Sequence, residues 1–129
     1  MSDIKCRILC IDDHKDSAEM LCALLAQDNH EVVTAASIAE ALELTKKKSF
    51  DLYVLDRRLP DGTGIELCQK LGEVCPGVPC IFYTGDVYDL HREQALAAGA
   101  EGYVSKPHIE TLIETVTKLL AEKECATTS

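Results

Sequence analysis

The chain has 129 residues and 47% hydrophobic content, which fits one compact domain with a buried core and leaves little room for a second. Its formal net charge of -9 and its pI near 4.8 argue against nucleic-acid binding by this domain alone, because such surfaces need a basic face. No apolar run approaches the roughly 20 residues of a membrane span, and the start MSDIKCR lacks the apolar core of a signal peptide. We therefore expect a cytoplasmic protein without a membrane partner.

The expected secondary structure alternates strands and helices from beginning to end. Buried strands are indicated by short apolar runs, and helices by apolar residues at spacings of three and four. In chain order we expect a strand at 7–11, a helix with Ala18, Leu21, Cys22 and Leu25 inward, a strand at 31–35, a helix opened by a Ser37 and Glu40 capping box, a strand at 52–55, a loop at 59–64, a helix at 65–74, a strand at 80–83, a helix at 90–98, a strand at 102–105 and a helix from Ile109.

Five strands alternating with five helices imply right-handed crossovers and a parallel sheet covered on both faces, which is a doubly wound α/β fold. We expect residues 1–123 to form this domain and 124–129 to form a flexible polar tail. Seven cysteines are present, but the count is odd and no CxxC pair occurs. Cys10, Cys22 and Cys68 are interpreted as inert core residues, and Cys125 as the most exposed thiol.

Polar residues follow four of the expected strands at the point where each ends. Asp12 and Asp13 follow ILCI, Asp56 follows LYVL, Thr84 follows CIFY, and Lys106 follows GYVS. Because parallel strands bring their carboxyl ends to one edge of a sheet, these side chains should meet there. Three carboxylates, a hydroxyl and an ammonium are suited to metal-assisted phosphoryl transfer.

Four motifs occur in order at these strand ends: DD at 12–13, LDRRLPDG at 55–62, YTGD at 83–86 and GYVSKP at 102–107. Together they resemble the receiver domain of two-component response regulators, and the resemblance spans nearly the whole chain. It implies a flavodoxin-like (βα)5 fold whose five-stranded parallel sheet has the order 2-1-3-4-5.

The resemblance implies that Asp56 accepts a phosphoryl group from a phosphohistidine, carried by a sensor histidine kinase or a histidine phosphotransfer protein. It further implies a Mg²⁺ cofactor. Asp13, Asp56 and the Arg58 backbone carbonyl would be direct ligands and Asp12 a ligand through water, since Mg²⁺ prefers oxygen donors and keeps several waters.

Three further residues take roles from the resemblance. Lys106 would pair with the phosphoryl oxygens, Thr84 would donate a hydrogen bond to them, and Tyr103 would change rotamer as space opens behind Thr84. This switch would alter the surface of the fourth helix, fifth strand and fifth helix. Through that surface, receivers bind an output domain or downstream protein, or form a homodimer, and the sequence leaves these choices open. The family also carries a cis bond before Pro107, where the sequence alone allows either isomer.

Two other functions remain open at this point, beside self-catalysed phosphotransfer and autodephosphorylation. One is a receiver-like scaffold that binds partners without being phosphorylated, against which the complete acidic set argues. The other is a hydrolase with an aspartyl-phosphate intermediate, which should carry a second acid two residues after its nucleophile, where this chain has Arg58. We hypothesise that Arg58 and Asp86 pair across the site and hinder hydrolysis of the acyl phosphate.

The four histidines give no case for a zinc site. His14 is interpreted as a helix-start residue rather than a ligand, because a hard, oxygen-seeking ion disfavours imidazole. His30 and His91 are expected at the surface. His108 stands where many receivers carry Phe, which removes an apolar contact at the start of the last helix.

Overall fold

The computed structural model describes residues 6–28, 30–85, 89–106 and 108–127. In chain order its elements are β1 (Arg7–Ile11), α1 (Lys15–Ala26), β2 (Glu31–Ala35), α2 (Ile38–Lys47), β3 (Leu52–Leu55), β4 (Arg58–Leu59), β5 (Gly62–Thr63), α3 (Gly64–Val74), β6 (Cys80–Thr84), α4 (Asp89–Ala97), β7 (Gly102–Ser105) and α5 (Ile109–Thr127). None of the helices in these segments combines the length and apolar character that a membrane crossing needs.

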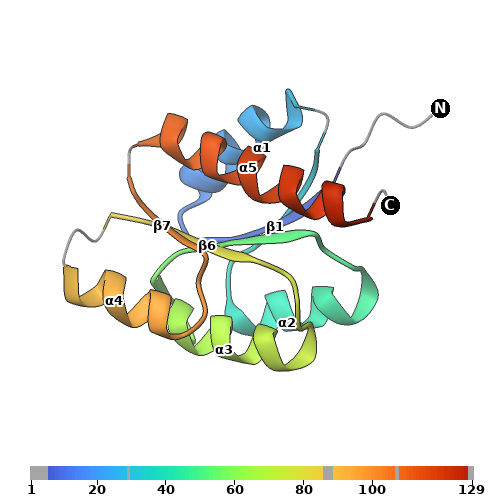
Figure 1. Ribbon diagram of the computed structural model, residues 1–129. Coiled ribbons are helices and arrows are strands. Elements are labelled where there is room, and N and C mark those ends of the chain that lie inside the picture. Colours follow the sequence, from blue (N-terminus) through green and yellow to red (C-terminus); the bar gives the residue numbers. More distant parts are fainter. Residues whose placement is uncertain (1–5, 29, 86–88, 107, 128–129) are drawn as a thin grey trace.

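A five-stranded parallel sheet forms the centre of the domain, with the order β2-β1-β3-β6-β7 (Figure 1). β4 and β5 form a separate antiparallel hairpin, so β6 and β7 are the fourth and fifth strands of the main sheet. The predicted doubly wound fold and its strand order 2-1-3-4-5 are therefore confirmed. β1, β3 and β6 are apolar almost throughout, as expected for strands buried on both faces.

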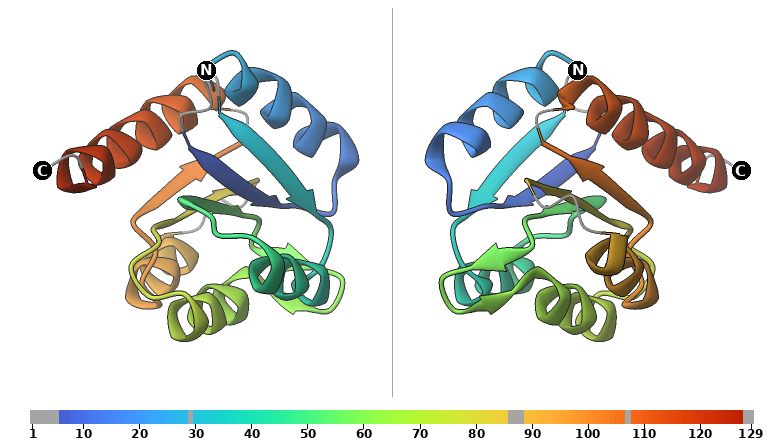
Figure 2. Two further views of the ribbon diagram at one scale, coloured as in Figure 1. Left: turned by 90° about the vertical axis from the view of Figure 1, so that its right-hand side faces the viewer. Right: turned by 90° about the vertical axis from the view of Figure 1, so that its left-hand side faces the viewer.

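Helices cover both faces of the sheet. α1 and α5 lie on one face, and α2, α3 and α4 lie on the other (Figures 1 and 2). Alternation of side chains along each strand divides the core into two apolar clusters. Ile8 and Leu52 pack with Leu25 and Leu112 on the α1/α5 side, whereas Leu55 belongs to the cluster on the α2/α3/α4 side.

Helix α2 begins with the predicted capping box. The Ser37 hydroxyl accepts a hydrogen bond from the Glu40 amide, and the Glu40 carboxylate accepts one from the Ala36 amide at 2.7 Å. The turn between β4 and β5 adds a second cap, because the Asp61 carboxylate accepts hydrogen bonds from the first two amides of α2 at 2.8 and 3.0 Å. These bonds lower the pKa of Asp61 and connect the segment that follows Asp56 to α2.

Some expectations differ from the structure. His30 is buried at 9% exposure, so its assignment to the surface was wrong, because local spacing does not show whether a residue directly before a strand is covered by the fold. Cys10 and Cys68 are buried as predicted, but Cys22 is only half-buried. Helix α5 continues to Thr127, so the first residues of the expected tail are helical. Three expectations fall outside what the structure describes: the Arg58–Asp86 pair, through Asp86, the isomer of the bond before Pro107, and the exposure of the Cys125 side chain.

Substitution of Gly64 tests how closely the start of α3 approaches the backbone of Asp56. A Cβ at this position would overlap the backbone carbonyl of Asp56 and lie 2.8 Å from the ring of Phe82. Gly64→Ala should therefore lower the free energy of unfolding by about 1–3 kcal/mol, the range for overpacking, measured by urea denaturation. Gly72→Ala in the same helix is the matched control, because nothing lies within 4 Å of the added atom. It should stabilise the protein by roughly 0.5–1 kcal/mol, and equal effects of the two substitutions would contradict the prediction.

Candidate functional site

The ends of β1, β3, β6 and β7 bring the predicted site residues to one edge of the sheet. Hydrogen bonds in the backbone continue past the strands at this edge: the Asp56 amide donates to the Ile11 carbonyl at 3.0 Å, and the Lys106 amide donates to the Thr84 carbonyl at 2.7 Å. The backbone at Asp56 and at Lys106 is therefore fixed by hydrogen bonds to the neighbouring strands, like the residues of the sheet.

Lys106 reaches across the sheet edge to two carboxylates. Its Nζ lies 2.9 Å from Oδ2 of Asp12 and 3.5 Å from Oδ2 of Asp56, and all three side chains are largely buried. Burial disfavours the ammonium, but the hydrogen bond to Asp12 and the charge of Asp56 outweigh it, so the pKa of Lys106 is raised. Burial also disfavours the Asp12 carboxylate, but hydrogen bonds from Lys106 and the His14 amide lower its pKa overall. The Asp12–Lys106 pair is thus fully ionised at neutral pH.

Asp56 is the most deeply buried of the three acids, with 7% of its side chain exposed. Burial is the main reason that its pKa is raised; the nearby Asp12 charge adds to the effect, and Lys106, the Arg57 amide and the Thr84 hydroxyl oppose it. The Arg57 amide donates to Oδ1 at 2.7 Å, and Thr84 is itself buried. Asp56 therefore holds its negative charge at a cost in stability.

His14 contacts all three acids. It occupies the N-cap position of α1, as predicted, but its side chain makes no capping bond. Instead, Nδ1 lies 3.0 Å from Asp12, 3.3 Å from Asp13 and 3.4 Å from Asp56. The hydrogen bond to Asp12 raises the pKa of His14. Sequence reasoning missed this contact, because only the rotamer shows that the ring turns toward the acids.

The donor atoms of Asp12, Asp13, His14 and Asp56 all lie within 4.8 Å of one another. The three carboxylates supply the oxygen donors that Mg²⁺ prefers, and Asp13 is exposed enough for the ion to keep several waters. The residues therefore fit the expected ion. His14 is not needed for this ligand set, because a hard cation disfavours imidazole.

A pocket of about 460 Å³ opens above Asp56. Four of the residues that line it were expected at the site: Asp56, Arg58, Thr84 and Lys106. The sequence did not indicate a place at the site for the other five, which are His14, Ser17, Arg57, Gly85 and His91. His91 of α4 is half-buried, and its Nε2 lies 2.9 Å from a terminal nitrogen of Arg57. The prediction that His91 lies at the surface therefore missed this contact. The contact depends on how α4 packs beside the segment that follows β3, which the sequence does not show.

Tyr103 lies away from the acids, on the α3/α4 side of the sheet. Its ring stacks on Phe82 at 6.1 Å between centroids, and the side chain is half-buried against the core. Because β6 and β7 are neighbours, Tyr103 pairs with Phe82, two residues before Thr84. The structure thus places the two expected switch residues on adjacent strands, β6 and β7.

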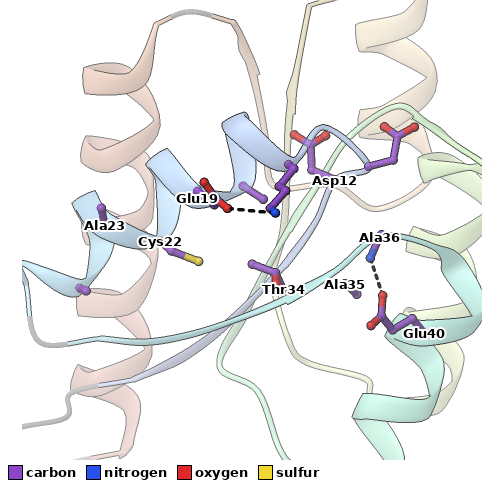
Figure 3. A pocket seen from close by; sticks show the side chains of 12 residues that line it. Asp12, Glu19, Cys22, Ala23, Thr34, Ala35, Ala36 and Glu40 are labelled. Atoms are coloured by element: carbon purple, nitrogen blue, oxygen red, sulfur yellow. Dashed lines mark hydrogen bonds and ion pairs between the residues drawn. The ribbon is translucent and has the colours of Figure 1, made fainter.

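A larger hollow of about 730 Å³ lies between α1 and β2 and borders the site at Asp12 and Asp13. Cys22 and Thr34 face each other across its floor, and Glu40 closes one end (Figure 3). The remaining walls are mostly alanine, with the Lys15–Glu19 ion pair at the rim. Asp56, Thr84 and Lys106 line the smaller pocket and not this hollow, so we place the chemistry above Asp56.

Comparison with known proteins agrees with this geometry. The family model of the response regulator receiver domain matches residues 8–117. The DNA-binding transcriptional activator DevR/DosR of Mycobacterium tuberculosis is 39% identical over 102 residues, which cover 78% of this chain and 47% of that protein. This chain thus spans about half the length of that regulator.

Solved structures give the same result over almost the entire chain. A CheY-like response regulator receiver domain protein from Methanospirillum hungatei is 32% identical with a TM-score of 0.88, covering 96% of this chain and 99% of its own. The BeF3-activated DrrB receiver domain is 29% identical with a TM-score of 0.82, covering 92% and 99%. The chain therefore belongs to the response regulator receiver domain family of two-component signal transduction.

Proposed function

We propose that Asp56 accepts a phosphoryl group from a phosphohistidine of a sensor histidine kinase or histidine phosphotransfer protein. The observation that carries this proposal is the position of one buried carboxylate at the base of an open pocket, bordered by the Lys106 ammonium and the Thr84 hydroxyl. An anion can enter this pocket and meet a nucleophile and two hydrogen-bond donors together.

In the proposed reaction, a carboxylate oxygen of Asp56 attacks phosphorus, the P–N bond to the donor imidazole breaks, and an acyl phosphate forms. The imidazole leaves with the bonding electron pair and takes up a proton. Lys106 faces the phosphoryl oxygens and stabilises the charge that they carry in the transition state. Lys106, the Arg57 amide and the Thr84 hydroxyl favour the carboxylate form of Asp56 against the effect of burial on its pKa, and a carboxylate nucleophile requires no separate base.

The proposal includes Mg²⁺ held by Asp13, Asp56 and the Arg58 backbone carbonyl, with Asp12 bound through water. When bound, the ion offsets repulsion between the acids and the incoming phosphoryl group. The geometry of the three carboxylates supports this set. The Arg58 carbonyl is included on the family resemblance, with Arg58 itself bordering the pocket.

We further propose that Thr84 and Tyr103 relay the phosphorylated state to the surface of α4, β7 and α5. Their adjacent strands and the stacking of Tyr103 on Phe82 support this path. An output domain or downstream protein would bind that surface, and a homodimer through it is a second arrangement. We also propose a cytoplasmic location, which membership of the response regulator receiver family favours.

The two rival functions are less well supported. A hydrolase needs a second acid to protonate its leaving group, and the Arg58 side chain at the pocket lining cannot serve. A scaffold that is never phosphorylated has no need of a buried Asp56 carboxyl group beside Lys106 and Thr84 at the base of an open pocket. Slow loss of phosphate by the protein itself remains part of the proposed function.

Intact mass spectrometry tests the phosphoacceptor. With Mg²⁺ and acetyl phosphate or phosphoramidate, the protein should gain one phosphoryl group, and Asp56→Asn should gain none. Asp28→Asn, which alters an exposed carboxylate at the end of α1, is the control and should be phosphorylated like the wild type. Modification of Asp56→Asn to the same extent would refute the assignment, and rapid turnover of phosphate esters without an adduct would favour the hydrolase.

The raised pKa of Asp56 predicts how stability depends on pH and metal. A group with a raised folded-state pKa favours folding most at acid pH, and this contribution is lost as pH rises through that pKa. Without metal at neutral pH, Asp56→Asn should therefore raise the Tm by a few degrees, with the difference shrinking on acidification. Scanning calorimetry in EDTA across a pH series measures this, and a lower Tm for Asp56→Asn at neutral pH would contradict it.

Added Mg²⁺ should reverse the order of stability. At a free concentration ten times its Kd, a ligand of the folded state adds about 1.4 kcal/mol. The wild type should gain this amount, whereas Asp56→Asn should gain much less because one carboxylate ligand is missing. An equal gain in the two proteins would place the ion elsewhere, and Asp28→Asn again serves as the control.

A further inference from the structure

The contact between Arg57 and His91 joins the phosphoacceptor loop to α4. Arg57 follows Asp56 directly, whereas His91 lies in the first turns of α4, and their side chains meet at 2.9 Å in the lining of the pocket above Asp56. Neither residue belongs to the acidic set, and none of the roles proposed above uses them.

The backbone of Arg57 is fixed on both sides. Its amide donates to the Asp56 carboxylate at 2.7 Å, and its carbonyl accepts a hydrogen bond from the Gly64 amide at 2.7 Å. The guanidinium is therefore carried by a backbone that cannot shift away from Asp56. Any change in where the guanidinium points must come from its own side-chain torsions.

The chemistry of the contact allows Arg57 to exchange His91 for a phosphoryl group as its hydrogen-bond partner. A guanidinium only donates hydrogen bonds, so Nε2 of His91 is the acceptor in this contact. A phosphoryl group carries about -1.5 to -2 charge at pH 7 and three acceptor oxygens. Hydrogen bonds between two ionised groups are stronger than those to a neutral acceptor, and Arg matches phosphate with two parallel donors.

Helix α4 depends on few packing contacts. Among its side chains that the structure describes, Ala95 alone is buried, at 1% exposure, whereas Leu90 and Leu96 are 60% and 43% exposed. A helix with so little buried apolar surface opens at low free-energy cost. Gain or loss of one hydrogen bond therefore changes its stability noticeably.

We propose that Arg57 is a phosphoryl-sensing residue: it holds α4 through His91 in the unphosphorylated protein and transfers to the phosphoryl group once Asp56 is modified, which releases α4. This inference rests on the proposed function of Asp56. It assigns to the residue after the phosphoacceptor a second route from the site to the α4 surface, beside Thr84 and Tyr103.

Amide hydrogen exchange of α4, measured with and without Mg²⁺ and beryllium fluoride, tests whether Arg57 leaves His91. Beryllium fluoride serves as the substitute for the phosphoryl group, and a receiver described as activated by BeF3 is among the similar structures. In the wild type, the adduct should speed exchange at the amides of α4 roughly tenfold, as expected for loss of one hydrogen bond to a charged group. The ¹⁵N signal of His91 Nε2 should shift as Arg57 leaves.

Variants separate sensing from simple support of the helix. Arg57→Met and His91→Ala should exchange roughly tenfold faster at α4 already without the adduct, which should then add less than twofold. His91→Gln, which keeps a hydrogen-bond acceptor, should restore most of the wild-type response. Arg92→Ala, an exposed change one residue along α4, is the matched control and should behave as the wild type.

Fluorine NMR of the bound adduct distinguishes the two proposals. If the adduct forms in the wild type but α4 exchange and the His91 signal do not change, Arg57 is no sensor, while the function of Asp56 stands. If Arg57→Met responds to the adduct like the wild type, the inference is likewise wrong. If no adduct forms in the wild type, the proposed function fails and this inference fails with it.

Discussion

Three carboxylates that repel one another lie at the edge of the sheet, within reach of one ammonium and one imidazole. Repulsion between like charges grows as water is removed, and Asp56 is almost fully buried. Lys106 offsets part of this repulsion, but it lies closer to Asp12 than to Asp56. The Asp56 carboxylate can therefore still bind a cation and attack an electrophile. The site is thus built at the expense of stability, a common feature of functional sites.

The fold tolerates this arrangement because the backbone around it is tightly held. The amide of Asp56 is bonded to β1, that of Lys106 to β6, and the segment after Asp56 is connected to α2 through Asp61. Gly64 lets α3 start directly against the Asp56 carbonyl, where any larger residue would displace the loop. Rigid surroundings prevent the acids from moving apart, which would be the easiest way to relieve their repulsion.

Rigidity is not uniform over the molecule. Helix α5 buries Leu112, Val116 and Leu120 in the core, whereas α4 buries only Ala95 among its described side chains. A helix with little buried apolar surface opens at low free-energy cost, so α4 is the helix that we expect to respond most to a change at Asp56. Helix α4 borders the pocket above Asp56 through His91, so a helix with little buried apolar surface lies directly beside the site.

The sequence by itself determined the alternation of strands and helices, the order of the sheet through family resemblance, and the arrival of Asp12, Asp13, Asp56, Thr84 and Lys106 at one edge. These follow from local periodicity and from the rule that parallel strands end together. The tertiary structure alone decided that His14 turns toward the acids, that His30 is buried and that His91 meets Arg57. Such contacts join residues far apart in the chain or depend on a single side-chain torsion, and neither leaves a periodic pattern in the sequence.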